Sequence, residues 1–408
     1  MKPKEYPFIF ESYFVLPNKK EINFNYKYKD LYFTEKIILP DEIPSNAENK
    51  LINKVLESLH LILGISYFKM YCPKKIIIPY QLSKAQADFL NLVYTKGLGE
   101  FFYKNKIDFR NLINFPYVDM PAIQPRRLDE AKKNRSLVGI GGGKDSIVAI
   151  ELLKKENKPV TGLILETGNV HIQKEVTGTA GIEFILIKRV LDNKLFELKD
   201  IYNGHVPFSA IFSFIALLVS VIYDYSSIIT ANEKSSNFGN VNYLGTEINH
   251  QWSKSEEFEN LFKDYVKKFV TPNVDFFSIL RPYSEMEIAK LFSSHKKYFP
   301  VFSSCNRNFK IKKNVNQKRW CGECPKCTFV FIMLAANLSR AEVVKIFDKN
   351  LLDDPQLIPL YQDLIGKGKM KPFDCVGTFE ESTEAFGIIK RSGEFDDDIV
   401  MKEIVIPA

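Results

Sequence analysis

From residue 136 onward, short apolar runs of strand length alternate with longer segments in which apolar residues recur at helical spacing. The first three runs lie at 137–140, 160–165 and 184–187, and a fourth lies at 228–230. They are almost continuously apolar, which is typical of strands that are buried on both faces of a sheet. Because neighbouring parallel strands need a crossover connection, this alternation predicts an α/β fold with a doubly wound parallel sheet.

The segment before this alternation has a different pattern. Between residues 8 and 39, apolar and polar residues alternate, as they do in antiparallel strands with one exposed face. Residues 51–63 and 83–94 have helical spacing, and a polar segment at 124–135 marks the predicted boundary. We therefore predict an N-terminal α+β domain over residues 1–134, an α/β domain over 135–345 and a C-terminal helical extension over 346–408.

The composition is that of an ordinary globular protein. The 408 residues are 45% hydrophobic and 26% charged, which excludes a collagen, a disordered chain and a coiled coil. The net charge of +7 fits anionic small molecules as well as nucleic acid. The longest apolar run, 208–223, contains three serines and is shorter than the about 20 residues that span a bilayer, so it predicts a buried helix. No signal peptide is evident, and we expect a cytoplasmic protein without membrane insertion.

A glycine-rich segment joins the first predicted strand of the α/β domain to its first helix. Consecutive glycines let the backbone adopt positive φ and approach a ligand, and a helix N-terminus attracts phosphate. Lys144 adds a cation and Ser146 a hydroxyl donor. Neither the P-loop nor the dinucleotide fingerprint fits, because Asp145 follows Lys144 and the third glycine position holds Lys144 or Ser146. The candidate nucleotide-binding residues of this loop are Gly141, Gly142, Gly143, Lys144, Asp145 and Ser146.

This loop resembles the pyrophosphate loop of the N-type ATP pyrophosphatases, Ser-Gly-Gly-x-Asp-Ser, with Gly141 in place of the first serine. The resemblance implies a Rossmann-like PP-loop fold that cleaves ATP between its α and β phosphates, adenylates a carboxylate or carbonyl oxygen, and releases pyrophosphate with Mg²⁺. It also implies that Asp145 helps to hold Mg²⁺ or orients the loop. Glu166 and Thr167, which end the second predicted strand, are candidates to flank the adenine or the ribose.

Four of the six cysteines lie close together in the sequence, at Cys305, Cys321, Cys324 and Cys327. In a chain without an export signal, such clustering indicates metal binding rather than disulfides. Four thiolates are a common ligand set of closed structural Zn²⁺ sites, so we predict a zinc module held by these four cysteines. An iron–sulfur cluster uses the same ligands, and four unlinked thiols are the third alternative. A closely similar spacing follows the same kind of loop in the 7-cyano-7-deazaguanine synthases.

Further segments resemble the glycopeptidyl-glutamate epimerases, the MurL family of peptidoglycan precursor synthesis. Besides the glycine loop they are 204–207 (Gly-His-Val-Pro), 231–233 (Ala-Asn-Glu) with Gly239 and Asn240, 250–255 (His-Gln-Trp-Ser-Lys-Ser), 320–327 (Trp-Cys-Gly-Glu-Cys-Pro-Lys-Cys), 373–378 (Phe-Asp-Cys-Val-Gly-Thr), 64–69 and 97–101. The resemblance implies that UDP-N-acetylmuramoyl-L-Ala-L-Glu is converted to its D-Glu epimer with ATP and Mg²⁺, yielding AMP and pyrophosphate. The expected partners are this substrate and ATP, without nucleic acid, and the N-terminal domain would recognise the substrate.

The sequence offers three candidates for the base that removes the proton in such a reaction. His205 precedes the apolar helix at 208–223, and imidazole titrates near neutral pH. Cys375 lies just before a predicted capping box, and a helix N-terminus lowers a thiol pKa. Glu233 follows the strand at 228–230, at the edge of the sheet where ligands bind in open α/β folds. His250 and Lys254 are weaker candidates for a phosphate or carboxylate contact.

Three other functions use the same features. One is a PP-loop synthetase similar to the 7-cyano-7-deazaguanine synthases, and another is a tRNA-modifying ATP pyrophosphatase. The latter needs a redox cysteine pair outside the metal set and a basic RNA-binding face, whereas only Cys72 and Cys375 remain and the net charge is modest. The last is a nonenzymatic nucleotide sensor, which would not turn ATP over.

Overall fold

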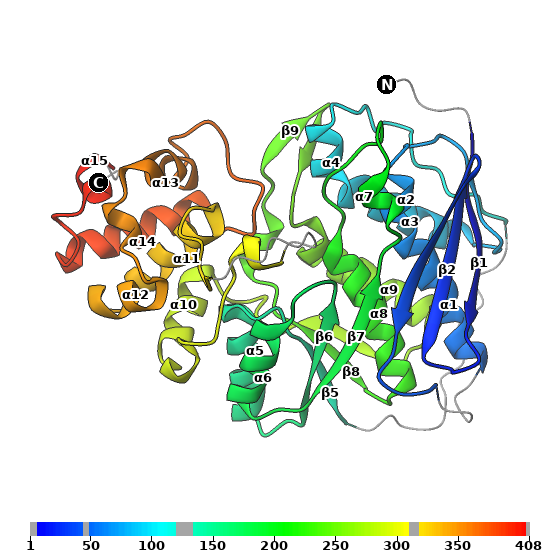
Figure 1. Ribbon diagram of the computed structural model, residues 1–408, viewed down its shortest axis with the longest axis horizontal. Coiled ribbons are helices and arrows are strands. Elements are labelled where there is room, and N and C mark those ends of the chain that lie inside the picture. Colours follow the sequence, from blue (N-terminus) through cyan, green and yellow to red (C-terminus); the bar gives the residue numbers. More distant parts are fainter. Residues whose placement is uncertain (1–5, 44–48, 120–133, 310–317, 405–408) are drawn as a thin grey trace.

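The computed structural model describes residues 6–43, 49–119, 134–309 and 318–404. Its largest element is a nine-stranded sheet in the order β11-β8-β5-β6-β7-β3-β2-β1-β4 (Figure 1). In chain order the strands of this sheet are β1 (Phe8–Val15), β2 (Glu21–Tyr28), β3 (Leu31–Ile38), β4 (Ile76–Ile77), β5 (Ser136–Gly139), β6 (Val160–Glu166), β7 (Phe184–Val190), β8 (Ser227–Thr230) and β11 (Asp275–Ser278). A separate hairpin is formed by β9 (Val241–Tyr243) and β10 (Thr246–Ile248).

The strands predicted from residue 136 onward form the parallel part of this sheet. β5 pairs in parallel with β6 on one side and with β8 on the other, while β7 extends the sheet beyond β6 and β11 extends it beyond β8. The prediction of a mostly parallel α/β sheet is therefore confirmed. The chain moves from β5 to β6 and β7 in one direction and then returns to the other side of β5, so a topological switch point lies between β5 and β8.

The N-terminal strands continue the same sheet. β1, β2 and β3 form an antiparallel meander, as the alternation predicts, and β3 pairs antiparallel with β7, where Ile37 lies opposite Arg189. The N-terminal and central parts of the chain therefore share one sheet. The polar segment 124–135, on which the predicted boundary rests, lies almost entirely outside the described residues, and the division into three domains stays a prediction.

Helices cover both faces of the parallel strands. Successive strand residues point to opposite sides, so Leu137 and Val138 belong to two different hydrophobic cores, as do Leu163 and Ile164. One core contains residues of α1 and α8, and the other contains residues of α5, α6, α10 and α11. The helices around the sheet are α1 (Asn49–Leu63), α2 (Ile65–Phe68), α3 (Lys84–Gly97), α4 (Gly99–Lys104), α5 (Lys144–Lys155), α6 (His171–Ala180), α7 (Lys194–Glu197), α8 (Phe208–Ile222) and α9 (Glu256–Tyr265).

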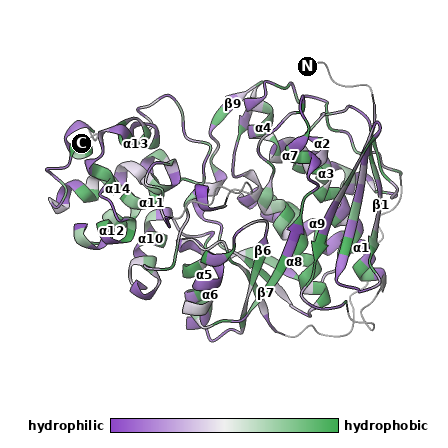
Figure 2. Cartoon of the chain, in the orientation of Figure 1, coloured by the Kyte–Doolittle hydropathy of each residue, from purple (hydrophilic) through white to green (hydrophobic). Residues whose placement is uncertain are grey.

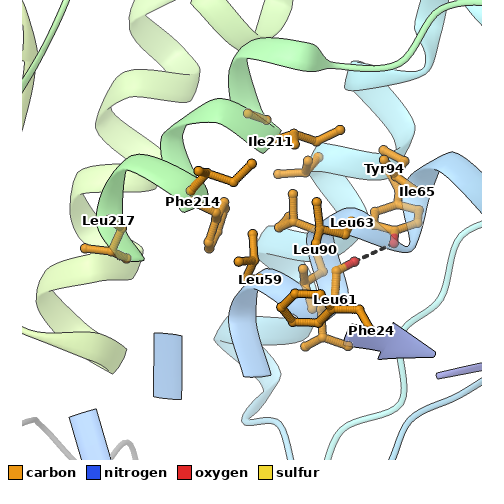
Figure 3. Close-up of a cluster of buried hydrophobic side chains, with 14 of the residues drawn as sticks. Phe24, Leu59, Leu61, Leu63, Ile65, Leu90, Tyr94, Ile211, Phe214 and Leu217 are labelled. Carbon is orange, nitrogen blue, oxygen red and sulfur yellow. Dashed lines mark hydrogen bonds between the residues drawn. The ribbon is translucent and has the colours of Figure 1, made fainter. Parts of the chain in front are cut away.

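The N-terminal helices pack on α8 through large apolar side chains (Figure 3). Figure 3 shows Leu59 of α1, Leu90 of α3 and Phe214 of α8 in one buried cluster. The Tyr94 hydroxyl, which is buried there, donates a hydrogen bond to the Leu61 carbonyl at 2.5 Å, so its polar group is satisfied inside the core. The apolar run at 208–223 is thus a buried helix, as predicted. Among the described residues, Lys50–Phe68 is the one helical stretch long and apolar enough to span a bilayer, and 78% of it is buried inside the protein.

The C-terminal helices form a second lobe beside the sheet (Figure 1). They are α10 (Glu285–Ser293), α11 (Pro325–Ala335), α12 (Arg340–Phe347), α13 (Ile358–Leu364), α14 (Phe379–Ser392) and α15 (Ile399–Glu403). The predicted capping box is present, because the Thr378 hydroxyl accepts from the Glu381 backbone and the Glu381 carboxylate accepts from the Thr378 backbone. In Figure 2 hydrophobic residues run through both the sheet lobe and this lobe, and the core that contains α5 and α6 continues into α12, α13 and α14.

Candidate active site

The glycine loop connects β5 to α5, and its three glycines differ in the room around them. Gly142 has φ +87°, and a Cβ there would lie 2.7 Å from the Ile172 side chain. A Cβ on Gly143 would lie 2.4 Å from the Ser304 hydroxyl. A Cβ on Gly141 would meet no heavy atom within 4 Å. The position at which this loop departs from the pyrophosphatase pattern is therefore the one that has room for a side chain.

A cavity of about 610 Å³ opens against this loop. It lies at the carboxyl ends of the parallel strands, where Gly139 of β5, Leu165 of β6 and Thr230 of β8 line it. Gly141 and Gly143 also face it, so the bend is open to a ligand rather than filled by side chains. This is the switch point of the sheet, which is where ligands bind in open α/β folds.

The cavity wall is rich in positive charge. Lys254 and Lys326 line it, as does Lys69, whose ammonium donates to the Gly204 carbonyl at 2.5 Å. Burial lowers the pKa of Lys69 to about 8. Arg189 lines the cavity as well, but its charge is balanced by a buried ion pair with Glu35 at 2.6 Å. The lysines give the cavity the charge that phosphate and carboxylate groups require.

Lys144 and Asp145 have different surroundings although they are adjacent in the sequence. Lys144 is fully buried, its ammonium pairs with Asp145 and Glu285, and it is absent from the cavity wall. Asp145 lines the cavity. Burial would raise the pKa of Asp145, but the charges of Lys144 and Lys326 hold it below its ordinary value, so the carboxylate stays ionised and fits a Mg²⁺ ligand. Ser146 also lines the cavity, and its hydroxyl donates to the Gly143 carbonyl at 3.0 Å.

Cys375 lines the same cavity from the loop between α13 and α14. The Lys254 ammonium donates to its sulfur at 3.2 Å, and His250 also hydrogen bonds to this thiol. Burial would raise the pKa of Cys375, but Lys254 and His250 lower it to about 6. Two cationic side chains therefore support the predicted low pKa of this thiol, which the sequence predicts from the helix that follows.

His250 is held by Glu100, the second residue of α4. The two side chains share a hydrogen bond of 2.5 Å between His250 Nδ1 and Glu100 Oε2. Burial would lower the pKa of His250, but Cys375 and Glu100 raise it to about 9. Burial would raise the pKa of Glu100, whereas His250, His205 and Lys104 lower it to about 2. At neutral pH the three groups therefore form a row of alternating charge: thiolate, imidazolium and carboxylate.

His205 lies beside this row. Its Nδ1 is 3.4 Å from the Glu100 carboxylate, and its ring centre is 4.6 Å from that of His250. Burial and the neighbouring charge of His250 lower the pKa of His205 to about 3. The ring is therefore neutral at physiological pH, and it is a much weaker base than an ordinary histidine.

The other predicted residues are divided between the cavity and its surroundings. Thr167 lines the cavity, while Glu166 is absent from its wall and lies 3.9 Å from Lys188. Glu233 is 3% exposed and is also absent from the wall, although its charge raises the pKa of Lys254, which burial alone would lower. Their roles toward a ligand stay predictions.

The four clustered cysteines come together, as their spacing predicts. Their sulfurs lie within 4.8 Å of one another, with 3.6 Å between Cys321 and Cys327 and 3.4 Å between Cys324 and Cys327. A tetrahedral zinc site with Zn–S bonds of about 2.3 Å separates its sulfurs by about 3.8 Å, so the geometry fits such an ion or an iron–sulfur cluster. The module also supports the glycine loop, because the Ser303 backbone, two residues before Cys305, donates to the Gly142 carbonyl at 3.0 Å.

Glu100 and Lys326 belong to the site although the sequence predicts no role for either. Lys326 lies between two of the clustered cysteines, and its ammonium donates to the Cys375 carbonyl. Glu100 lies in a segment, 97–101, that the sequence singled out only by resemblance. Nothing in the local sequence shows that Lys326 contacts Cys375 or that Glu100 contacts His250.

The fold and the site define an α/β protein in which a glycine loop, lysine side chains and Cys375 line one cavity. Two family models match the chain, the MurL N-terminal domain over residues 2–279 and the MurL C-terminal domain over residues 301–407. The chain belongs to the MurL family.

Two relatives carry the same name, UDP-N-acetyl-alpha-D-muramoyl-L-alanyl-L-glutamate epimerase. The relative from Micromonospora sp. (strain ATCC 39149 / NRRL 15099 / SCC 1413) is 36% identical over 377 residues, which cover 91% of this chain and 83% of the relative. The relative from Xanthomonas oryzae pv. oryzae (strain MAFF 311018) is 37% identical over 357 residues, which cover 87% of this chain and 78% of the relative. Among solved structures, NMN synthetase from Francisella tularensis matches 53% of this chain and 82% of its own at 13% identity, with a TM-score of 0.26.

Proposed function

We propose that this protein is an ATP-dependent epimerase that converts the terminal L-Glu of UDP-N-acetylmuramoyl-L-Ala-L-Glu to D-Glu during peptidoglycan precursor synthesis. The names of relatives that align over most of both chains support the substrate and the reaction. The observation that carries the ATP-dependent mechanism is the common cavity: an open glycine loop and a thiol with a lowered pKa face the same space. The cytoplasm is where such a substrate and ATP would meet the enzyme.

The chemistry explains why a phosphate-binding loop and a base belong together. The α-proton beside a carboxylate is very weakly acidic, because its removal places a second negative charge on the same group. Adenylation with ATP turns the carboxyl into a mixed anhydride, and the α-proton becomes far more acidic. A base of modest strength then suffices, and water releases AMP after the proton has returned on the other face. The candidate bases are Cys375, His205 and Glu233.

The residues of the loop have separate tasks in this proposal. The backbone of Gly141, Gly142 and Gly143, with the N-terminus of α5, would bind the phosphates of ATP. Asp145 would hold Mg²⁺, which offsets the charge of the pyrophosphate that leaves. Lys144 would act indirectly, because its buried ammonium holds the Asp145 carboxylate in place. The four thiolates of the cysteine cluster would hold Zn²⁺ as a structural ion.

One assay tests the proposal. The protein is incubated in D₂O with ATP, Mg²⁺ and UDP-N-acetylmuramoyl-L-Ala-L-Glu, and we expect AMP formation that depends on the substrate, with deuterium at the glutamate α-carbon. AMP without deuterium would indicate a synthetase or a hydrolase instead, and no turnover of ATP would indicate a sensor. Asp145→Ala should abolish AMP formation, and normal AMP formation by this variant would contradict the assignment of the loop.

A further inference from the structure

We propose that the Cys375 thiolate exchanges the α-proton on one face of the glutamyl residue, and that His250 and Glu100 position it for this step. The inference rests on the proposed function and selects one base among its three candidates. Cys375 would be a catalytic residue, since it faces the cavity. His250 and Glu100 would be positioning residues, since they reach the substrate only through the sulfur.

The geometry favours Cys375 over the other two candidates. Cys375 lies on the cavity wall together with the glycine loop and Lys254, which contacts its sulfur, whereas Glu233 and His205 are absent from that wall. The neutral, weakly basic His205 has little capacity to take a proton at neutral pH, because an effective base has a pKa near the working pH. The pKa of Cys375, about 6, lies close to that optimum.

The thiolate is stabilised from several elements of the fold. Lys254, at the end of the 3₁₀ turn Trp252–Lys254, contacts the sulfur directly, and His250 contacts it from the preceding loop. Lys326 of α11 adds positive charge from the side of the cysteine module. Other ionisable groups around this cluster are Asp145, Glu233, Asp374, Glu100, His205, Lys104 and Lys69.

Glu100 completes the arrangement by holding the proton on His250. An imidazolium beside the sulfur stabilises the thiolate, and a neutral imidazole does so less. The carboxylate of Glu100 raises the pKa of His250, so the imidazolium persists through neutral pH. A carboxylate, an imidazole and a nucleophilic or basic atom in one row is the logic of catalytic triads, which are recognised by geometry rather than by sequence order.

The protons and electrons of this step balance. The sulfur lone pair takes the α-proton, the C–H electron pair becomes the enolate of the adenylated carboxyl, and Cys375 becomes a neutral thiol. The opposite face of the planar carbon takes a proton that originates in water, and Cys375 gives its proton back to water. One proton leaves the substrate and one enters, so the α-carbon changes configuration without oxidation or reduction.

A divalent cation shared by Glu100, His205 and His250 is the competing interpretation, because their donor atoms lie within 4.8 Å of one another. Two ligands of one tetrahedral zinc ion with bonds of about 2.0 Å stand about 3.3 Å apart. The 2.5 Å between His250 and Glu100 is shorter and is a hydrogen-bond distance. The geometry therefore places a proton between these two groups.

The first experiment separates proton transfer from adenylation. For Cys375→Ala and Cys375→Ser we expect deuterium incorporation to fall about 100-fold or more, the usual contribution of a general base, and to fall much further than AMP formation. Equal loss of both signals would mean that Cys375 serves ATP rather than the α-proton, and unchanged deuterium incorporation would exclude it as the base. If the wild-type protein makes neither AMP nor deuterated product, the proposed function fails, and not merely the choice of base.

The second experiment needs no substrate and begins with the wild-type protein. The rate of alkylation by iodoacetamide is followed from pH 5 to 10 at the peptide that contains Cys375, and we expect a midpoint near pH 6. Cys72 is the internal control, since burial raises its pKa to about 12 and it should stay unmodified. A midpoint near 8 or above for Cys375 would overturn the proposal.

The positioning role of Glu100 has its own test. Glu100→Gln keeps the size of the side chain and should raise the alkylation midpoint of Cys375 by about one pH unit. The matched control is Glu151→Gln, which removes a carboxylate that hydrogen bonds to Tyr298, outside the cavity wall, and should leave the midpoint unchanged. An unchanged midpoint in Glu100→Gln would contradict the role. If the wild-type protein binds a second metal ion per chain and Glu100→Gln does not, the result would support a cation site at Glu100, His205 and His250 instead.

Discussion

The Lys254 ammonium donates a hydrogen bond to the sulfur of Cys375 at 3.2 Å, although 121 positions separate the two residues in the sequence. Lys254 follows a loop of the sheet lobe, and Cys375 lies on the loop that enters α14 of the C-terminal lobe. The two lobes therefore meet at the cavity through a charged contact. A cation this close favours the thiolate over the thiol.

Replacement of Lys254 by methionine should raise the pKa of Cys375. The variant keeps the length of the side chain and removes the charge that, with His250, lowers this pKa to about 6. We expect the alkylation midpoint of Cys375 to rise by about 1 unit or more, the effect of an opposite charge in direct contact. A midpoint that stays at the wild-type value would show that Lys254 does not support the thiolate.

The dependence of the epimerisation rate on pH should be bell-shaped. Cys375 must be deprotonated, so the rate should fall as the pH drops below about 6. His250 must be protonated to stabilise the thiolate, so the rate should fall again as the pH rises above about 9. The check is kcat/KM for deuterium incorporation from pH 5 to 10, which reports the ionisation of the free enzyme. A rate that rises steadily up to pH 10 would be inconsistent with this pair.

The glycines of the loop should differ in their tolerance of a side chain. Gly142→Ala places a Cβ at positive φ and against Ile172, and Gly143→Ala places one against Ser304. Gly142→Ala should destabilise the protein by about 1–3 kcal/mol and reduce AMP formation. Gly143→Ala should destabilise it less, because the Ser304 hydroxyl can rotate away from the added Cβ. Gly141→Ser should have the same unfolding temperature as the wild-type protein, since a Cβ at this position meets open space. Thermal unfolding measures all three, and equal destabilisation by the three changes would refute the assigned geometry.

Removal of the proposed zinc ion from the cysteine cluster should unfold the C-terminal lobe. Cys305 and Cys327 are fully buried, and without an ion their sulfurs would have few partners. Cys327→Ala, or treatment with a strong chelator, should lower the folding yield and the unfolding temperature. Metal content per chain is the direct measurement, and Cys375→Ala is the control that should keep its metal. Metal-free protein that remains folded would contradict a structural role.

Several features were predictable because they depend on residues near one another in the sequence. Continuously apolar runs indicated the buried parallel strands, and alternation indicated the N-terminal meander. The spacing of Cys321, Cys324 and Cys327 indicated a shared site, because a helix start and tight turns bring such neighbours together. The glycine loop indicated an anion site at the start of α5 for the same reason.

The sequence by itself thus determined the N-terminal meander, four of the parallel strands, the glycine loop and the cysteine set. Only the tertiary structure decided that β3 pairs with β7, that Lys144 turns inward to Glu285, and that Glu100 and His250 support Cys375. The physical reason is the range of the interactions. Local spacing constrains backbone conformation within a few residues, whereas ion pairs and thiol contacts between distant segments depend on how the sheet and the two lobes pack.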